Sequence, residues 1–139
     1  MTAKELTEET PDPQFEHARR ALKAMAWADA ASLFEQYVVA NPESAAAWGN
    51  LSLAYRGLGE TARQLAAARR AYELAPKALS LLLVLGEALW CSGLFADALT
   101  CAQHALKAFP NDPMLMEIAA KAHYGLRQPE KTIAAARRA

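Results

Sequence analysis

The sequence predicts an all-α protein built as an array of about four helical hairpins, and three observations support this. Gly (6) and Pro (7) are sparse among 139 residues that are 53% hydrophobic, and alanine is abundant, which favours helices. Apolar residues recur at spacings of three and four, as on one face of a helix. Pro42, Pro76 and Pro110 follow one another at a constant interval of 34 residues, and such a period is typical of repeat proteins.

The prolines divide the chain into a lead-in and one domain. Residues 1–10 are polar and acidic, and we expect them to be frayed. Residues 11–139 are predicted to form a single domain, which is long enough to bury a substantial core. The four expected repeats are residues 11–44, 45–78, 79–112 and 113–139.

The first repeat begins at Asp12 and Pro13, because aspartate caps helices and proline suits the first helical position. Apolar side chains follow at helical spacing as far as Met25. We expect a short turn over residues 27–29, and then a second helix that ends at Asn41-Pro42.

The second repeat is the clearest. Ser44 is a suitable cap for a helix that runs to about Gly57, and Gly59 supplies a tight corner. A second helix is predicted from about Thr61 to Leu74, before Pro76.

The third and fourth repeats keep the same order. The third has leucines where the second has its large apolar residues, and Gly93 takes the corner. Asp112-Pro113 starts the fourth repeat, as Asp12-Pro13 starts the first. Its second helix is predicted to begin at Pro129, with Ile133 and Ala136 facing inward.

The second repeat resembles the tetratricopeptide repeat, because Trp48, Leu51, Ser52 and Tyr55 stand at that family's spacing before the closing proline. The resemblance implies a right-handed superhelical array whose first helices line a concave, peptide-binding side. It implies close helix contacts at the small residues Ala18, Ser52, Gly86 and Ala120. It also implies wedges between hairpins at the large residues Trp48, Leu82 and Met116.

The family register predicts which residues of the first helices face the concave side, and these form the candidate peptide-binding groove. They are apolar or aromatic with mixed charges between, which suits a peptide with apolar anchors. They are Phe15, Arg19, Leu22, Asn50, Leu53, Arg56, Leu83, Val84, Glu87, Trp90, Ile118, Lys121 and Tyr124, and Met114 and Glu117 share this side.

Two of these residues have competing interpretations. In chaperone-binding members of the family, an asparagine at the place of Asn50 helps to hold the ligand's terminal carboxylate. The cationic partners of that clamp are missing here, so we predict that this chain does not bind chaperone C-termini; Asn50 bonds a ligand backbone or is plain helix surface. Trp90 is an interface anchor or packs into the core.

Composition argues against several other functions. Lys plus Arg and Asp plus Glu are 15 each, whereas phosphate binding needs a basic excess. The basic run of Arg63, Arg69 and Arg70 is expected to be a solvated helix face. Cys91 and Cys101 match neither a disulfide framework nor a metal motif. Without a signal peptide or membrane span, we expect a cytoplasmic protein.

No sequence motif predicts catalysis, and we expect neither a cofactor nor a metal, since the three histidines are scattered. The leading hypothesis is a non-catalytic interaction module, an adaptor, scaffold or chaperone-like protein. One alternative is the N-terminal docking portion of a larger multidomain enzyme; another is a small secretion-type chaperone. The last helix lacks a polar capping helix, and truncation of the chain, a partner or self-association through this helix would each cover its inward face.

Overall fold

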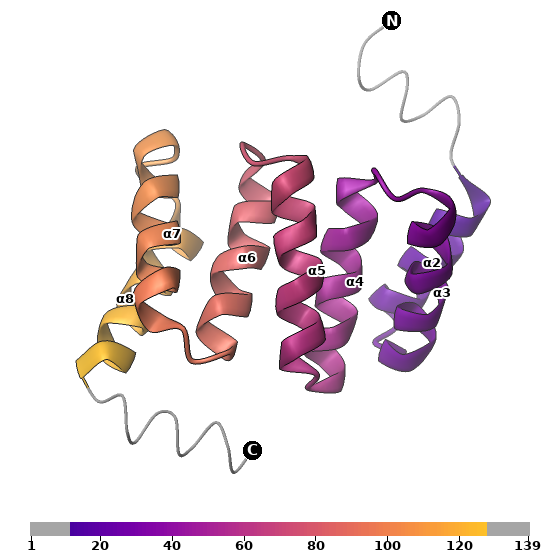
Figure 1. The fold of residues 1–139 in the computed structure, drawn as a ribbon, viewed down its shortest axis with the longest axis horizontal. Helices are drawn as coiled ribbons and strands as arrows, with labels where there is room; N and C mark the ends of the chain where they lie inside the picture. Colours follow the sequence, from indigo (N-terminus) through magenta and orange to yellow (C-terminus); the bar gives the residue numbers. More distant parts are fainter. Residues whose placement is uncertain (1–11, 128–139) are drawn as a thin grey trace, which may run out of the picture.

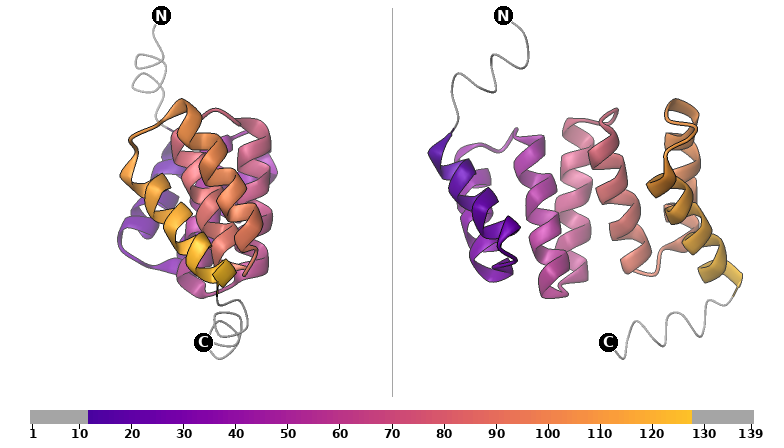
Figure 2. Two further views of the ribbon diagram at one scale, coloured as in Figure 1. Left: turned by 90° about the vertical axis from the view of Figure 1, so that its left-hand side faces the viewer. Right: turned by 180° about the vertical axis from the view of Figure 1, so that it is seen from behind.

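The computed structural model describes residues 12–127, and it confirms the expected all-α array. Within these residues there are seven helices and no strand, arranged in a single row of antiparallel hairpins (Figure 1). The row runs from α2 at the right of the view to α8 at the left. In the view from behind, at the right of Figure 2, left and right are exchanged and the helices follow one another in the same order. The helices are α2 (Pro13–Lys23), α3 (Trp27–Ala40), α4 (Ala45–Leu58), α5 (Thr61–Leu74), α6 (Leu79–Cys91), α7 (Phe95–Ala108) and α8 (Pro113–Arg127).

The predicted helix starts are confirmed by their capping hydrogen bonds. The Asp12 side chain accepts from the backbone N–H of Gln14 at 2.9 Å. The Ser44 hydroxyl accepts from Ala47 at 3.2 Å, and Asp112 accepts from Leu115 at 2.9 Å. Each bond satisfies a backbone donor that the first turn of a helix leaves without a partner.

The corners within the hairpins show one error in the sequence prediction. Gly59 (φ 73°) and Gly93 (φ 77°) adopt the left-handed conformation at the ends of their first helices, which glycine does without a steric penalty. In the first hairpin Met25 occupies the same repeat position with φ 60°. The turn therefore lies at residues 24–26 and not at the predicted residues 27–29, since Trp27 already begins α3. The prediction missed this turn because methionine is not a residue that usually marks one.

Small residues let the helices of the core approach closely. Ala18, Ala47, Ala68 and Ala98 are fully buried, as is expected where two backbones come near each other. Ser52 is also buried, and its hydroxyl donates to the backbone carbonyl of Gln64 at 2.9 Å. The small residue predicted at this place therefore joins the two helices of the second hairpin.

The junctions between successive hairpins are of two kinds. At the first, Trp27 packs on Gly57, where an added Cβ would overlap the indole ring. At the third, Phe95 packs on Gly125, where an added Cβ would lie 2.7 Å from the ring. The equivalent residues at the middle junction, 34 positions from each of these, are Thr61 and Cys91.

The face that α8 buries differs from the prediction. Leu115 and Ile118 are buried against the preceding hairpin, whereas Met116 is 54% exposed and Ala120 is also exposed. The predictions for Pro129, Ile133, Ala136 and self-association lie outside the described residues.

Candidate functional site

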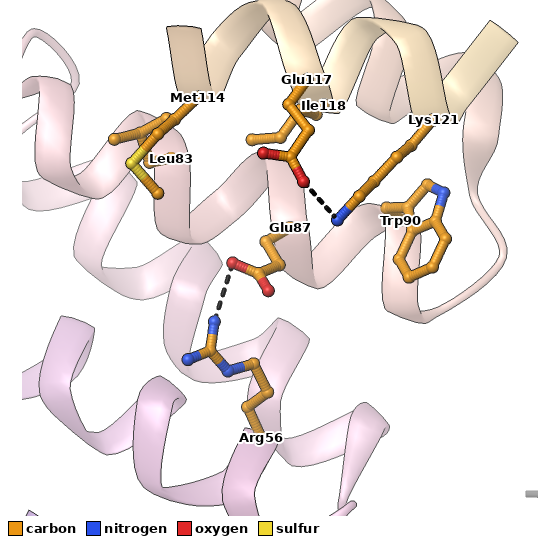
Figure 3. A pocket seen from close by; sticks show the side chains of 8 residues that line it. All are labelled: Arg56, Leu83, Glu87, Trp90, Met114, Glu117, Ile118 and Lys121. Atoms are coloured by element: carbon orange, nitrogen blue, oxygen red, sulfur yellow. Dashed lines mark ion pairs between the residues drawn. The ribbon is translucent and has the colours of Figure 1, made fainter.

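A cavity of about 200 Å³ lies among the first helices of the last three repeats, between α4, α6 and α8 (Figure 3). Small-molecule pockets are usually about 300–1,000 Å³, so this volume suits a single side chain of a larger partner. The lining residues are those that the repeat register places on the concave side: Arg56, Leu83, Glu87, Trp90, Met114, Glu117, Ile118 and Lys121.

The apolar part of the lining comes from both α6 and α8. Leu83 is partly buried against the last core cluster, and Ile118 is only 7% exposed. Met114 is 55% exposed at the rim, and a flexible thioether there can adapt to different side chains. The cavity therefore has a fixed apolar wall and a movable apolar edge.

The charged part of the lining is paired within itself. Arg56 Nη1 of α4 lies 2.8 Å from Glu87 Oε2 of α6, and this ion pair joins the second and third repeats. Lys121 Nζ lies 3.2 Å from Glu117 Oε1, and dashed lines mark both pairs in Figure 3. Two cations and two anions line the cavity, so it presents no excess of charge to a ligand.

Trp90 takes part in both the core and the cavity. Its side chain packs against the cluster that includes Leu85 and Leu89. Lys121 Nζ lies 5.0 Å from the centroid of its ring, which is within the range of a cation–π contact. The two interpretations of Trp90 are therefore compatible, because one part of the ring packs inside while the residue lines the cavity.

The structure brings six of the thirteen predicted groove residues to this cavity, and it places the others elsewhere. Asn50, Leu53 and Val84 are partly buried on the same helices without lining it. Arg19 forms an ion pair with Glu16 at 3.3 Å, and Tyr124 is 59% exposed on α8. The prediction identified the helix face, but it did not identify which part of that face is hollow.

Two predicted groove residues belong to the core of the first hairpin. The ring of Phe15 lies edge-on to Phe34, with centroids 5.6 Å apart, and to Tyr37 at 5.4 Å. Leu22 packs against the same cluster. Aromatic rings favour this edge-to-face contact, so Phe15 packs partly against the core of the first hairpin and does not line the cavity.

The described residues hold little that points to chemistry at a metal or a nucleophile. Within residues 12–127 no three His, Cys, Asp or Glu side chains gather as a metal site would require. Burial raises the pKa of the Cys91 thiol, although a hydrogen bond from Gln64 opposes this, and burial also raises the pKa of Cys101. Both thiols are thus protonated at neutral pH and are weak nucleophiles.

The membrane prediction can be compared with the same residues. None of the helices in the described part of the chain combines the length and the apolar character that a membrane crossing requires.

Comparison with protein families finds a match to the model described as Tetratricopeptide repeat over residues 15–78 and 83–139. A comparison with curated proteins finds no match.

Similar solved structures include three that are useful here. The Sgt2 TPR domain from Aspergillus fumigatus is 17% identical, with a TM-score of 0.77 and coverage of 88% of this chain and 83% of that one. The first TPR of Spaghetti (RPAP3) bound to HSP90 peptide SRMEEVD is 18% identical, with a TM-score of 0.77 and coverage of 82% and 90%. PcrH in complex with the chaperone binding region of PopD is 16% identical, with a TM-score of 0.66 and coverage of 96% and 95%. At these identities the likeness concerns the fold.

Proposed function

Because the chain belongs to the tetratricopeptide repeat family, we propose that it is a non-catalytic protein–protein interaction module, an adaptor or scaffold, that holds a peptide of a partner on its concave side. One observation supports this most directly: the cavity between α4, α6 and α8 combines an apolar wall with charges that neutralise one another. The proposal includes a cytoplasmic location.

The cavity favours an uncharged apolar side chain as the anchor of the peptide. Leu83, Ile118 and Trp90 offer apolar contact, and such anchors supply much of the affinity at peptide interfaces. The glutamates paired with Arg56 and Lys121 line the cavity themselves, so the lining carries no net positive charge that would attract a ligand carboxylate.

This arrangement differs from a site that reads a terminal carboxylate. In the family register the cationic positions of such a site correspond to Phe15, Arg19, Ser80 and Val84, and only Arg19 is a cation. Phe15 and Val84 are apolar and partly buried. We therefore expect that the peptide SRMEEVD and a copy with an amidated C-terminus behave alike toward this chain, by isothermal titration calorimetry. A preference for the free acid would contradict this expectation.

The main test is capture of a partner from native lysate with concave-side variants. We expect Leu83→Glu and Trp90→Ala each to lose the partner, because one places a charge in the apolar wall and the other removes the anchor contact. Lys107→Glu, on α7 and away from the cavity, is the matched control. Circular dichroism checks that helix content is retained, and unchanged capture by both cavity variants would refute the proposal.

A second candidate function is a small secretion-type chaperone. The observation that favours it is the fold likeness to PcrH, which was solved in complex with the chaperone binding region of PopD and aligns over 96% of this chain and 95% of that one. On this proposal the captured protein should lose solubility when it is expressed alone and regain it when this chain is co-expressed. A partner that is equally soluble in both cases would exclude this candidate.

A further inference from the structure

Three further cavities recur at equivalent places in successive hairpins, where a second helix packs beside a first helix. One is lined by α2 and α3, the next by α4 and α5, and the third by α6 and α7 with one residue of α5. Asp29, Arg63 and Asp97 line the three cavities at the same repeat position, 34 residues apart. The hairpin repeat thus produces one groove in each unit, away from the concave cavity.

The middle groove, on α4 and α5, is the largest of the three, at about 390 Å³. The buried side chains of Leu51 and Ala67 and the partly buried ring of Trp48 make its apolar surface. Trp48 is held in place because its indole N–H donates to the backbone carbonyl of Pro42 at 2.9 Å. The groove therefore has room for an apolar side chain against a fixed aromatic wall.

Two arginines stand along this groove, and no acidic residue lines it. Arg63 and Arg70 are seven residues apart on α5, which places them roughly 10 Å apart along the helix axis. Their side chains are 66% and 44% exposed, so both can reach a ligand. The neighbouring grooves have an aspartate in place of Arg63, so the positive charge is specific to the middle one.

The acidic residues near the groove do not remove this charge. Arg63 pairs with Glu60 at 3.3 Å and Arg70 with Glu73 at 3.2 Å, both three residues away on exposed surface. Exposed pairs of this kind contribute little to stability, so a bidentate ligand carboxylate can replace them. Glu35 lies at the edge of the groove as well, and its carboxylate accepts a hydrogen bond at 2.6 Å from Oη of the lining residue Tyr55.

We propose that the groove between α4 and α5 is a second interaction site, which binds an extended acidic segment of a partner protein. A chain in the extended polyproline II conformation has three residues per turn and advances about 3.1 Å per residue, so carboxylates three residues apart lie on one face and span roughly the distance between Arg63 and Arg70. An apolar side chain between them enters the groove beside Trp48. The proposed ligand is thus a peptide segment in which an acidic residue is followed by an apolar residue, and a second acidic residue stands three positions after the first.

The test uses the labelled peptide GSGELAEGSG and the full-length chain, with fluorescence anisotropy as the readout. We expect binding that weakens as NaCl is raised, because both contacts are ionic. The peptides GSGKLAKGSG and GSGEAAEGSG, which lack the charge and the apolar side chain, should bind at least about tenfold more weakly.

Variants of α5 distinguish this groove from other surfaces. Arg63→Asp gives the middle groove the residue of its neighbours, and it should weaken binding at least about tenfold, as should Arg70→Gln. Arg69→Gln, on the same helix but outside the lining, is the matched control and should bind normally. Leu83→Glu should also bind normally, because the concave cavity is not involved.

Several outcomes would overturn the proposal. They are the absence of binding by GSGELAEGSG, equal binding by Arg63→Asp, and equal binding of the lysine peptide. Loss of binding in Leu83→Glu would assign the peptide to the concave cavity instead. A dimer that Arg63→Asp disrupts in sedimentation velocity, without peptide binding, would assign the groove to a second copy of the chain.

Discussion

The outer junctions of the array are packed in a different way from the middle one. At each outer junction an aromatic ring at the start of a second helix lies on a glycine near the end of the next first helix. At the middle junction the polar groups of Gln64 and Cys91 meet, and the Arg56–Glu87 ion pair crosses on the concave side. The middle junction also has apolar packing, since Ala68 of α5 shares a core cluster with Leu85 and Leu89 of α6. Its difference from the outer junctions is that polar contacts replace the pairing of a ring with a glycine.

This difference matters for function because the concave cavity crosses the middle junction. Arg56 comes from the second repeat, and the other lining residues come from the third and fourth. Polar contacts can be exchanged for contacts to a ligand, whereas a ring packed on a glycine cannot separate without opening a cavity. The cavity thus crosses both the middle and the third junction, and under the proposed function ligand binding would be connected to packing at both of them.

The largest expected effect concerns the aromatic residues that begin the second helices. Phe95→Ala removes a ring that is only 5% exposed, and we expect a loss of about 3–5 kcal/mol in the free energy of unfolding. Thr61→Ala, at the equivalent exposed position, should change it by less than about 0.5 kcal/mol. Urea denaturation measures both, and equal losses would mean that the junctions do not differ in this way.

Gly57→Ala tests the same contact from the opposite side. The added methyl group overlaps the Trp27 ring, so we expect a loss of about 1–3 kcal/mol in unfolding free energy. In a Trp27→Ala background the methyl group fits, and alanine should then stabilise the helix by up to about 1 kcal/mol. A double-mutant cycle separates the two terms, and a coupling energy near zero would rule out the close contact.

The ion pair at the middle junction should contribute less. Arg56 and Glu87 have side chains that are 42% and 34% exposed, so we expect a coupling energy of about 0–1 kcal/mol. A double-mutant cycle with Arg56→Met, Glu87→Gln and the double variant measures this coupling energy in the free energy of unfolding. The coupling should decrease in 1 M NaCl, where charges are screened within about 3 Å, and a coupling unaffected by salt would show that another contact dominates.

The smallest effect is expected at the corners. Met25 adopts a left-handed conformation at φ 60°, which costs a non-glycine residue about 1–2 kcal/mol. Met25→Gly relieves this cost, although the greater freedom of glycine in the unfolded chain offsets about 0.5–1 kcal/mol of it. We expect thermal unfolding to show slight stabilisation, and destabilisation by Gly59→Ala, which imposes the same cost, is the control.

The sequence predicted the arrangement of helices well because the signals for it are local. Asp12, Ser44 and Asp112 cap helices within three residues of themselves, and Gly59 and Gly93 close hairpins through their own backbone conformation. The Met25 corner was missed because methionine has no intrinsic preference for a left-handed turn, and only the packing of α2 against α3 imposes it there.

The sequence predicted the concave side but not its shape. A repeat register indicates which residues share a face, and Arg56, Glu87 and Lys121 do line one cavity. It could not show that Phe15 finds two aromatic neighbours on α3, nor that the cations are already paired. Such features depend on side chains from different helices, and their distances are set only when the hairpins pack together.

The sequence by itself therefore determined that this protein is a row of helical hairpins with a period of 34 residues, because caps, corners and apolar spacing act along the chain. Only the tertiary structure decided where that row is hollow. The concave cavity, the groove with Arg63 and Arg70, and the contrast between the junctions arise from residues far apart in sequence. A repeat pattern describes the backbone of each hairpin, whereas a cavity or groove depends on how side chains of different helices pack, within one hairpin or between two.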